Sequence, residues 1–184
     1  DAIVVQPSEP WLPWSTPLFT PDFHRLLAER RAPGGVVIQW LQLYRIDIPE
    51  FAAILHSFRE ALGEVQIWYP PGTGEILLVA GDVKLPPSPQ ESVLMAWDRV
   101  LGVDFPARPW LDDTDVEAWL ETAGGGDLTR LRARLEFLLP LREEAGLDLS
   151  RNLLASLGEV RRRDRSRDRE QEPEKPAPGG PEER

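Results

Sequence analysis

The chain of 184 residues is 41% hydrophobic and carries a formal net charge of −10, so it has the length and apolar content for one domain with a tail. Eight basic and seven acidic side chains fall in residues 161–184, which leaves −11 on residues 1–160. A body this acidic disfavours non-specific binding to nucleic acid or to an anionic membrane surface and is compatible with a cationic ligand. The absence of cysteine excludes disulfides and thiolate metal sites, and no apolar run approaches the ~20 residues that span a bilayer.

The first predicted elements in chain order are a strand, a stiff loop and a helix. Residues 2–5 are apolar without alternation, the pattern of a strand buried on both faces in a parallel sheet. Residues 6–20 contain four prolines and two tryptophans, and because proline fixes φ we expect a stiff loop. Thr20 followed by Pro21 is typical of a helix start, and Pro33-Gly-Gly is expected to end that helix. Its predicted apolar face consists of Phe23, Leu26 and Leu27.

A second strand and a longer helix follow. Residues 36–41 repeat the continuous apolar pattern and predict a second buried strand. Asp47 and Glu50 are placed as a capping pair for the next helix. The apolar residues that follow recur at helical spacing and give the clearest helix prediction in the chain. These residues are Phe51, Ile54, Leu55, Phe58 and Leu62.

Two more strands are predicted over residues 65–69 and 75–80. Only the Pro- and Gly-containing turn 70–74 joins them, so they are expected to pair antiparallel. The resulting order of strand, helix, strand, helix and hairpin matches the C-terminal half of a methyltransferase-like Rossmann sheet, an α/β fold in which the last strand enters antiparallel beside its neighbours. The first half of such a sheet carries a glycine-rich turn and an acidic ribose-binding residue, and the sequence contains neither in the required context.

The chain is therefore expected to be the C-terminal part of a larger α/β protein whose N-terminal half is missing. In that case residues 2–5 form a bare sheet edge. We expect the isolated chain to be inactive, and to be poorly folded or to self-associate through this edge.

After residue 82 the patterns change to short helices. Asp113 or a neighbour is expected to begin one of them, with Val116, Trp119 and Leu120 on one face. Residues 161–184 mix charges, contain Pro and Gly and lack aromatics, which predicts a disordered tail. The other helical patterns cover residues 88–101, which follow the capping box Ser88-Pro-Gln-Glu91, then 128–138 and 149–157. The predicted parts are thus a partial Rossmann-like domain over 1–82, a helical extension over 83–160 and a disordered tail over 161–184.

Three stretches together resemble the spermidine synthase-like family. They are Asp1-Ala-Ile-Val-Val-Gln-Pro-Ser-Glu-Pro-Trp11, Pro17-Leu-Phe-Thr-Pro-Asp-Phe23 and Ala32-Pro-Gly-Gly-Val-Val-Ile-Gln-Trp-Leu-Gln-Leu-Tyr44. The likeness covers about residues 1–82, is weaker over 130–157, and is closest to bacterial members in which this domain follows a block of membrane-spanning helices.

The resemblance implies transfer of an aminopropyl group from decarboxylated S-adenosylmethionine to an amine such as putrescine. The attacking amine is protonated at neutral pH, so a carboxylate must hold the ammonium and accept its proton. Synthases place an Asp directly after the strand and a second acid three residues later, before a proline. Those catalytic positions are here Gln6 and Glu9, with Pro10 following. Glu9 keeps a carboxylate, whereas the amide of Gln6 does not take up a proton near pH 7.

Further residues are candidates for binding the substrate. Tyr69, which precedes a proline, resembles the Tyr-Pro that closes over the polyamine in synthases; its alternative role is an aromatic packed under the hairpin turn. Gln39 resembles, to within one residue of register, a substrate-facing glutamine after the second strand. Ser8 and Trp11 lie in the first loop, where Trp11 and Trp14 either line a substrate slot or stiffen the loop by packing against prolines.

Other chemistry has no support in the residue pattern. His24 and His56 fall in helices without a Ser, Cys or acidic partner and are expected on the surface. No spacing of His, Asp and Glu predicts a metal site.

Two functional hypotheses follow from the resemblance. In the first, the parent protein binds decarboxylated S-adenosylmethionine or S-adenosylmethionine, and this segment supplies the amine side of a transferase site. In the second, the domain has lost catalysis and is a binding or regulatory module for a polyamine or nucleoside, attached to a membrane protein. Both place this segment in the cytoplasm, next to membrane helices of the parent. The expected partners are a small amine and the missing N-terminal half of the same fold, without nucleic acid, and a homo-oligomer is compatible with both.

Overall fold

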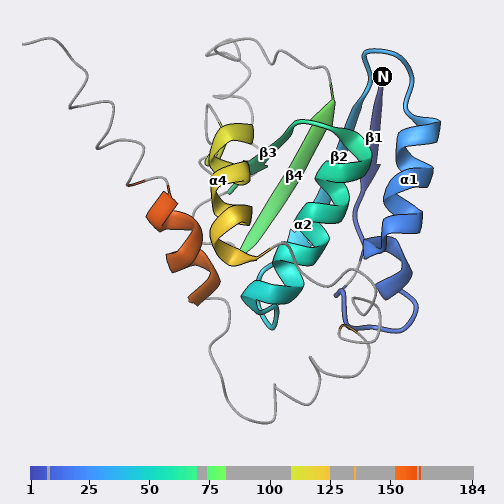
Figure 1. Ribbon diagram of the computed structural model, residues 1–184. Coiled ribbons are helices and arrows are strands. Elements are labelled where there is room, and N and C mark those ends of the chain that lie inside the picture. The colour runs from blue at the N-terminus through green and yellow to red at the C-terminus, as the bar shows by residue number, and fades with distance from the viewer. Residues whose placement is uncertain are drawn as a thin grey trace, which may run out of the picture.

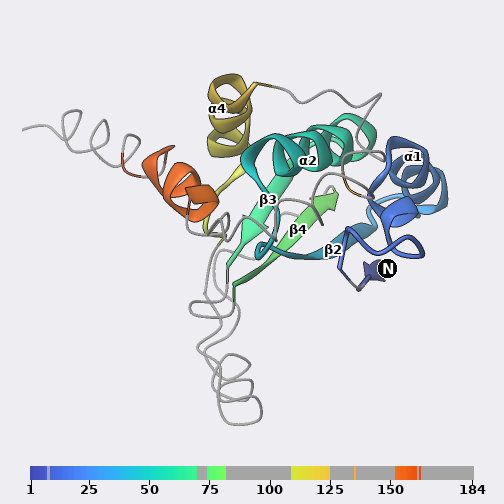
Figure 2. The same cartoon turned by 90° about the horizontal axis from the view of Figure 1, so that it is seen from below.

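The computed structural model describes residues 1–7, 9–69, 74–81, 109–124, 135, 152–160 and 162. These residues form an α/β fold with a four-stranded mixed sheet and a layer of helices packed against it (Figure 1). Turning the molecule shows helices α1, α2 and α4 on the same side of the sheet (Figure 2). The elements are β1 (Ala2–Val5), the 3₁₀ helix η1 (Thr16–Phe19), α1 (Pro21–Arg30), β2 (Val36–Gln42), α2 (Ile48–Leu62), β3 (Val65–Trp68), β4 (Glu75–Gly81) and α4 (Asp113–Ala123), with a further helix over 152–160.

The strand order in the sheet is β1-β2-β4-β3. β1 and β2 are parallel, and β4 lies between β2 and β3 and is antiparallel to both. The predicted antiparallel hairpin is therefore confirmed. The three strands β1, β2 and β3 all run in one direction, so their carboxyl ends and the start of β4 meet at one edge of the sheet.

Glycine allows the close contact at the opposite edge. Gly81, the last residue of β4, pairs with Val36 at φ 140°, and a Cβ atom at this position would lie 2.5 Å from the Gly35 carbonyl oxygen. A side chain there would force β4 away from the start of β2.

The core lies between the sheet and α2. Every second residue of β2 and β4 is buried, and so are the five apolar positions from which the helix was predicted. Asp47 begins α2 as predicted, since its carboxylate accepts a hydrogen bond of 2.8 Å from the Ile48 N–H. Glu50 lies in the first turn of α2 and is fully buried. Hydrophobic periodicity thus located the central helix because its apolar face packs directly on the strands.

The predicted burial of residues 2–5 on both faces is wrong. β1 pairs only with β2 among the described strands, and its residues alternate between exposed and half-buried. Val4 is 67% exposed. The described helices cover one face of the sheet and β1 is its outermost strand, so one face and one edge of this apolar strand face outward.

The predicted start of α1 is confirmed, and its predicted apolar face is confirmed for Phe23 and Leu27 but not for Leu26. Thr20 precedes the first helical residue, yet its hydroxyl donates to the Pro17 carbonyl at 2.7 Å rather than capping the helix. Leu26 is 42% exposed, whereas His24 is completely buried. The expected surface position of His24 is therefore wrong, and the helix turns this polar residue toward the sheet.

The helix α4 packs on the same core. Asp112 caps it, in a capping box with Asp115, which confirms the predicted start. Trp119 is fully buried: its ring meets the Phe51 ring edge-on at 5.3 Å, and its indole N–H donates to Ser156 in the helix over 152–160 at 3.0 Å. The other buried residues of this part are Leu111, Val116, Leu120, Leu135, Leu153 and Leu157.

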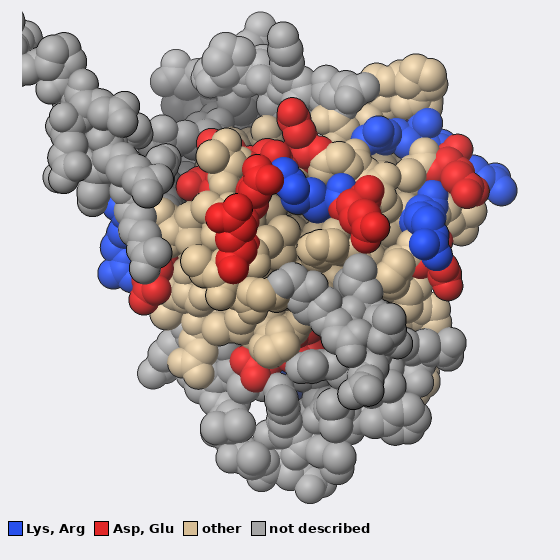
Figure 3. All heavy atoms as spheres, in the orientation of Figure 1, with Lys and Arg blue, Asp and Glu red and all other residues tan. Residues whose placement is uncertain are grey.

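Charge is distributed unevenly over the helical face. Acidic side chains gather over α4, while acidic and basic side chains alternate over α1 (Figure 3). The predicted helix over 88–101 and the predicted tail over 161–184, apart from Arg162, lie outside the described residues, as do most of the positions between 125 and 151.

Candidate functional site

The candidate site lies at the edge where β1, β2 and β3 end and β4 begins. Gln6, directly after β1, is exposed, and Glu9 is half-buried in the loop that follows. This loop is held by its own hydrogen bonds: the Leu12 N–H donates to the Glu9 carbonyl at 3.1 Å, and the buried Thr16 hydroxyl lies 2.7 Å from the Pro10 carbonyl. The expected stiffness of the proline-rich loop therefore has a second cause besides proline, since these internal bonds hold the backbone around Glu9.

Trp11 and Tyr44 form an aromatic pair beside this loop. Their ring centroids are 5.9 Å apart at an angle of 66°, and the Arg45 guanidinium lies 5.5 Å from the Trp11 centroid. Arg45 has φ 66°, a left-handed conformation that is uncommon outside glycine. Trp11 is only 7% exposed and belongs to the core. Of its two predicted roles, these contacts favour stiffening of the loop, because the chain's own Arg45 takes the cation position over its ring.

Two carboxylates act on the Tyr44 hydroxyl. Burial, then the charges of Glu9 and Glu75, raise the pKa of Tyr44, and the nearby Arg45 partly offsets them. Tyr44 remains 37% exposed, so water reaches this group. The structure thus places Glu9 of the first loop and Glu75 of β4 near enough to Tyr44 for both charges to act on its hydroxyl.

Glu75 was not predicted as a site residue. It is the first residue of β4 and pairs with Gln42, the last residue of β2. Its carboxylate accepts a hydrogen bond of 3.1 Å from the indole N–H of Trp40. Its position depends on the insertion of β4 beside β2, which no local pattern in the sequence indicates; a glutamate directly after the hairpin turn was the only available signal.

Gln39 is placed away from this edge. It lies in the middle of β2 and is fully buried. Its Oε1 lies 3.1 Å from His24 Nε2, and its amide donates to the Leu18 carbonyl at 2.9 Å. The structure thus joins Gln39 to α1 and η1 and does not bring it to Glu9.

Tyr69 lies at the far strand of the sheet. Its ring packs against Trp110, with centroids 5.1 Å apart. The strands β2 and β4 separate β3 from β1, which corresponds to about 14 Å across the sheet. This contact favours the packing role of Tyr69 over closure above Glu9. Ser8 lies outside the described residues.

The described part of the site suits an organic cation better than a metal ion. Two carboxylates and a tyrosine hydroxyl supply hydrogen-bond acceptors and negative charge, and the rings of Trp40 and Tyr44 offer apolar surface. Within the described residues, no group of three or more His, Asp or Glu is arranged to hold a metal, and no helix is long and apolar enough to cross a membrane.

Comparison with protein-family models, with curated proteins and with solved structures found no match to this chain.

Proposed function

We propose that this chain is the C-terminal part of a spermidine synthase-like domain and that its sheet edge binds the amine substrate. The observation that carries the proposal is that two acids lie at the carboxyl-end edge of neighbouring strands: Glu9 in the loop after β1, and Glu75 paired with Gln42 at the end of β2. In open α/β sheets, ligands bind outside the carboxyl ends of the strands, so the acids stand where a ligand is expected.

The strand order supports the fold part of this proposal. A methyltransferase-like Rossmann sheet ends in an antiparallel strand inserted among parallel ones, and β4 takes such a place between β2 and β3. The uncharged, proline-free strand β1 has the composition of an interior strand, since edge strands are normally protected by charge or proline. A further parallel strand beside β1 would complete the sheet.

The cofactor would belong to the part of the domain that this sequence lacks. Decarboxylated S-adenosylmethionine, or S-adenosylmethionine, is held in such folds by a glycine-rich turn and an acidic ribose-binding residue, and neither is present here. The residues of this chain therefore cannot hold the cofactor by themselves. The role that we propose for them is binding of the amine substrate.

In the proposed site, the carboxylates of Glu9 and Glu75 hold the ammonium groups of a diamine or polyamine. Glu9 also accepts the proton that the attacking nitrogen must lose, because the amide at Gln6 has no basic lone pair. The Tyr44 hydroxyl is protonated at neutral pH, as in any tyrosine, and its pKa is raised further, so the hydroxyl is a hydrogen-bond donor and acceptor.

Calorimetric titration of the 184-residue chain with putrescine and with spermidine tests the proposal. We expect binding that Glu9→Gln and Glu75→Gln each weaken about tenfold, the size of one lost charge-assisted hydrogen bond. Glu29→Gln, at an exposed position of α1, makes the same charge change away from the site and serves as the matched control. Absence of binding by a chain that circular dichroism shows to be folded, or an equal loss in the control, would overturn the proposal.

A second candidate is the amine-binding module without catalysis, attached to a membrane protein. The observation that favours it is Gln6, which stands exposed after β1 where the synthases have their Asp. The two candidate functions can be told apart by measuring aminopropyl transfer in a longer protein that contains both this chain and the missing half. If Gln6 is the reason for a lost activity, Gln6→Asp should raise aminopropyl transfer there, whereas binding without turnover in both forms supports the module.

A further inference from the structure

A buried polar network joins His24 of α1, Ser57 of α2 and Gln39 of β2 between the helix layer and the sheet. His24 Nδ1 lies 2.7 Å from the Ser57 hydroxyl, and His24 Nε2 lies 3.1 Å from Gln39 Oε1. The three side chains are 0%, 2% and 0% exposed. They were not predicted to meet, because they come from three elements far apart in the sequence.

The hydrogen-bond roles in this network follow from the chemistry of the amide. Gln39 Oε1 can only accept, so His24 Nε2 carries the proton. In a neutral imidazole Nδ1 then has the free lone pair, and the Ser57 hydroxyl donates to it. The Gln39 amide N–H in turn donates a hydrogen bond of 2.9 Å to the Leu18 carbonyl. All bonds are satisfied while His24 is uncharged.

The network connects four elements: η1 through Leu18, α1 through His24, α2 through Ser57 and β2 through Gln39. Besides His24, only Leu27 of α1 is buried. A helix of 10 residues is too short to be stable alone, so its attachment decides whether it stays folded. The His24 ring also contacts Phe58 edge-on at 5.3 Å, which makes it the largest buried anchor of α1.

No charged group is arranged to stabilise an imidazolium at this place in the described residues. η1 and β2 contain no ionisable residue. On α1, Asp22 and Arg25 pair with each other at the surface, and Glu29 and Arg30 are exposed. The ionisable residues of α2 are engaged or distant: His56 lies near Glu60, Arg59 is bonded to Asp113 and Glu117, and Glu50 lies two helical turns before Ser57, about 10 Å along the axis.

We propose that this network is a proton-sensitive lock that fastens η1 and α1 to α2 and the sheet, and that it opens when His24 takes up a proton. A proton on Nδ1 makes this nitrogen a donor to the Ser57 oxygen, so the Ser57 hydroxyl hydrogen loses its acceptor, and the imidazolium is an unpaired charge in the core. The opened segment adjoins the loop that carries Glu9 and Trp11, so acid would also release that loop. The lock does not depend on amine binding.

The direction of the effect follows from the difference between the pKa of His24 in the locked form and the pKa of a free histidine. Burial lowers the pKa of His24 from 6.5 to about 4, against a smaller raising effect of its bond to Gln39. A group with a lowered pKa stabilises the locked form fully above the free value, and this contribution is lost as the pH falls from 6.5 toward 4. For a free histidine in the open form, the opening equilibrium rises about 30-fold between pH 7.5 and pH 5. At pH 5 most carboxylates are still ionised.

Hydrogen exchange of the full chain, read by mass spectrometry on peptides and corrected for the intrinsic rate at each pH, tests the lock. We expect amide protection over α1 to fall about 30-fold between pH 7.5 and pH 5. Protection over α4 and β4 is expected to stay constant, because their contacts do not involve His24. A uniform fall over all segments, or none over α1, would overturn the proposal.

Substitutions assign the effect to the residue. His24→Phe keeps a ring in the core but takes up no proton, so the pH dependence over α1 should disappear. The only other histidine, His56, is half-buried on α2, and His56→Phe is the matched control that should retain the dependence. If His24→Phe does not fold, the ring resonances of His24 in the wild-type chain decide: their titration must coincide with the loss of α1 protection, and a titration without that loss rejects the lock.

Discussion

The two helices that flank α2 are fastened to it by networks of opposite character. On the α1 side the network of His24, Ser57 and Gln39 is uncharged and at most 2% exposed. On the α4 side, Arg59 and Asp113 form an ion pair with side chains 29% and 26% exposed. Burial explains the difference. A charge without a partner is too costly in the dry interior, whereas a half-buried pair keeps part of its hydration.

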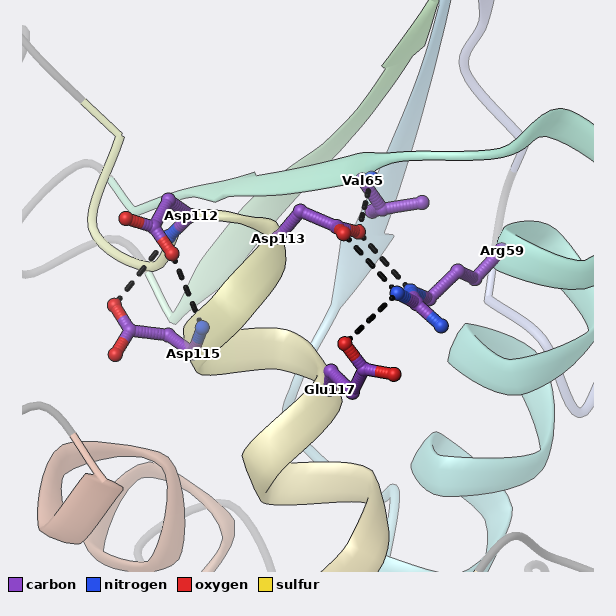
Figure 4. Close-up of polar contacts among 6 residues, drawn as sticks. All are labelled: Arg59, Val65, Asp112, Asp113, Asp115 and Glu117. Carbon is purple, nitrogen blue, oxygen red and sulfur yellow. Dashed lines mark hydrogen bonds and ion pairs between the residues drawn. The ribbon is translucent and has the colours of Figure 1, made fainter.

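The charged network also joins three elements, α2, α4 and β3, through hydrogen bonds to one carboxylate. Asp113 accepts hydrogen bonds from Arg59 Nε and Nη2, each at 3.0 Å, and from the Val65 N–H at 2.9 Å (Figure 4). Glu117, one turn further along α4, approaches Arg59 at 3.4 Å. One carboxylate therefore links the start of α4 to α2 and to the first residue of β3.

The two networks are expected to respond to acid in different pH windows. Burial alone would raise the pKa of Asp113, but its bonds from Arg59 and Val65 outweigh burial and lower it below 3.8. Its stabilising effect is present above that value and is lost only as the pH falls below it. The His24 contribution is already lost between 6.5 and about 4. Moderate acid should therefore loosen the α1 side while the α4 side holds.

The largest effect that separates the networks is expected from Asp113→Ala. The substitution leaves Arg59 half-buried without its partner and removes the acceptor of the Val65 N–H, so the free energy of unfolding should fall by about 2 kcal/mol. Urea denaturation at pH 7 measures it. Asp113→Asn, which keeps an oxygen for Val65, should cost less. A loss below about 0.5 kcal/mol would mean that the pair behaves as an ordinary surface ion pair.

A smaller effect is expected from Ser57→Ala on the other side. It removes one neutral hydrogen bond to His24 Nδ1, and the free energy of unfolding should fall by about 1 kcal/mol at pH 7. Since no formal charge is involved, the loss should be the same in 0.05 M and 1 M NaCl. A loss that shrinks with salt would show that the network is charged and contradict the assignment of a neutral His24.

The smallest effect is expected from Glu117→Gln. The Glu117 side chain is 58% exposed, and solvent screens its contact with Arg59. The substitution should lower the free energy of unfolding by no more than about 0.5 kcal/mol, and this difference should vanish in 1 M NaCl. A larger, salt-resistant loss would indicate that Glu117 shares the bond that we assign to Asp113 alone.

Part of the candidate site could be read from the residues and part could not. Glu9 was indicated by the resemblance to the synthases, and it lies in the loop that directly follows β1. Glu75 was missed, because its approach to Tyr44 follows from the pairing of β4 with β2. Tyr69 and Gln39 were grouped with Glu9 from motif likeness alone, whereas the Tyr69 ring packs on Trp110 and the Gln39 side chain bonds to His24 and to Leu18.

The sequence by itself determined the elements whose signals are local. The apolar spacing of α2, the capping of α4 by Asp112 and the short turn between β3 and β4 each depend on residues within a few positions of one another. The edge position of β1 was expected from the element order and is confirmed for the described strands. Only the tertiary structure decided that His24 faces the core and that Glu75 lies beside the end of β2. These facts depend on which strand pairs with which and which face a helix covers, and such contacts between distant segments leave no periodic pattern in either segment.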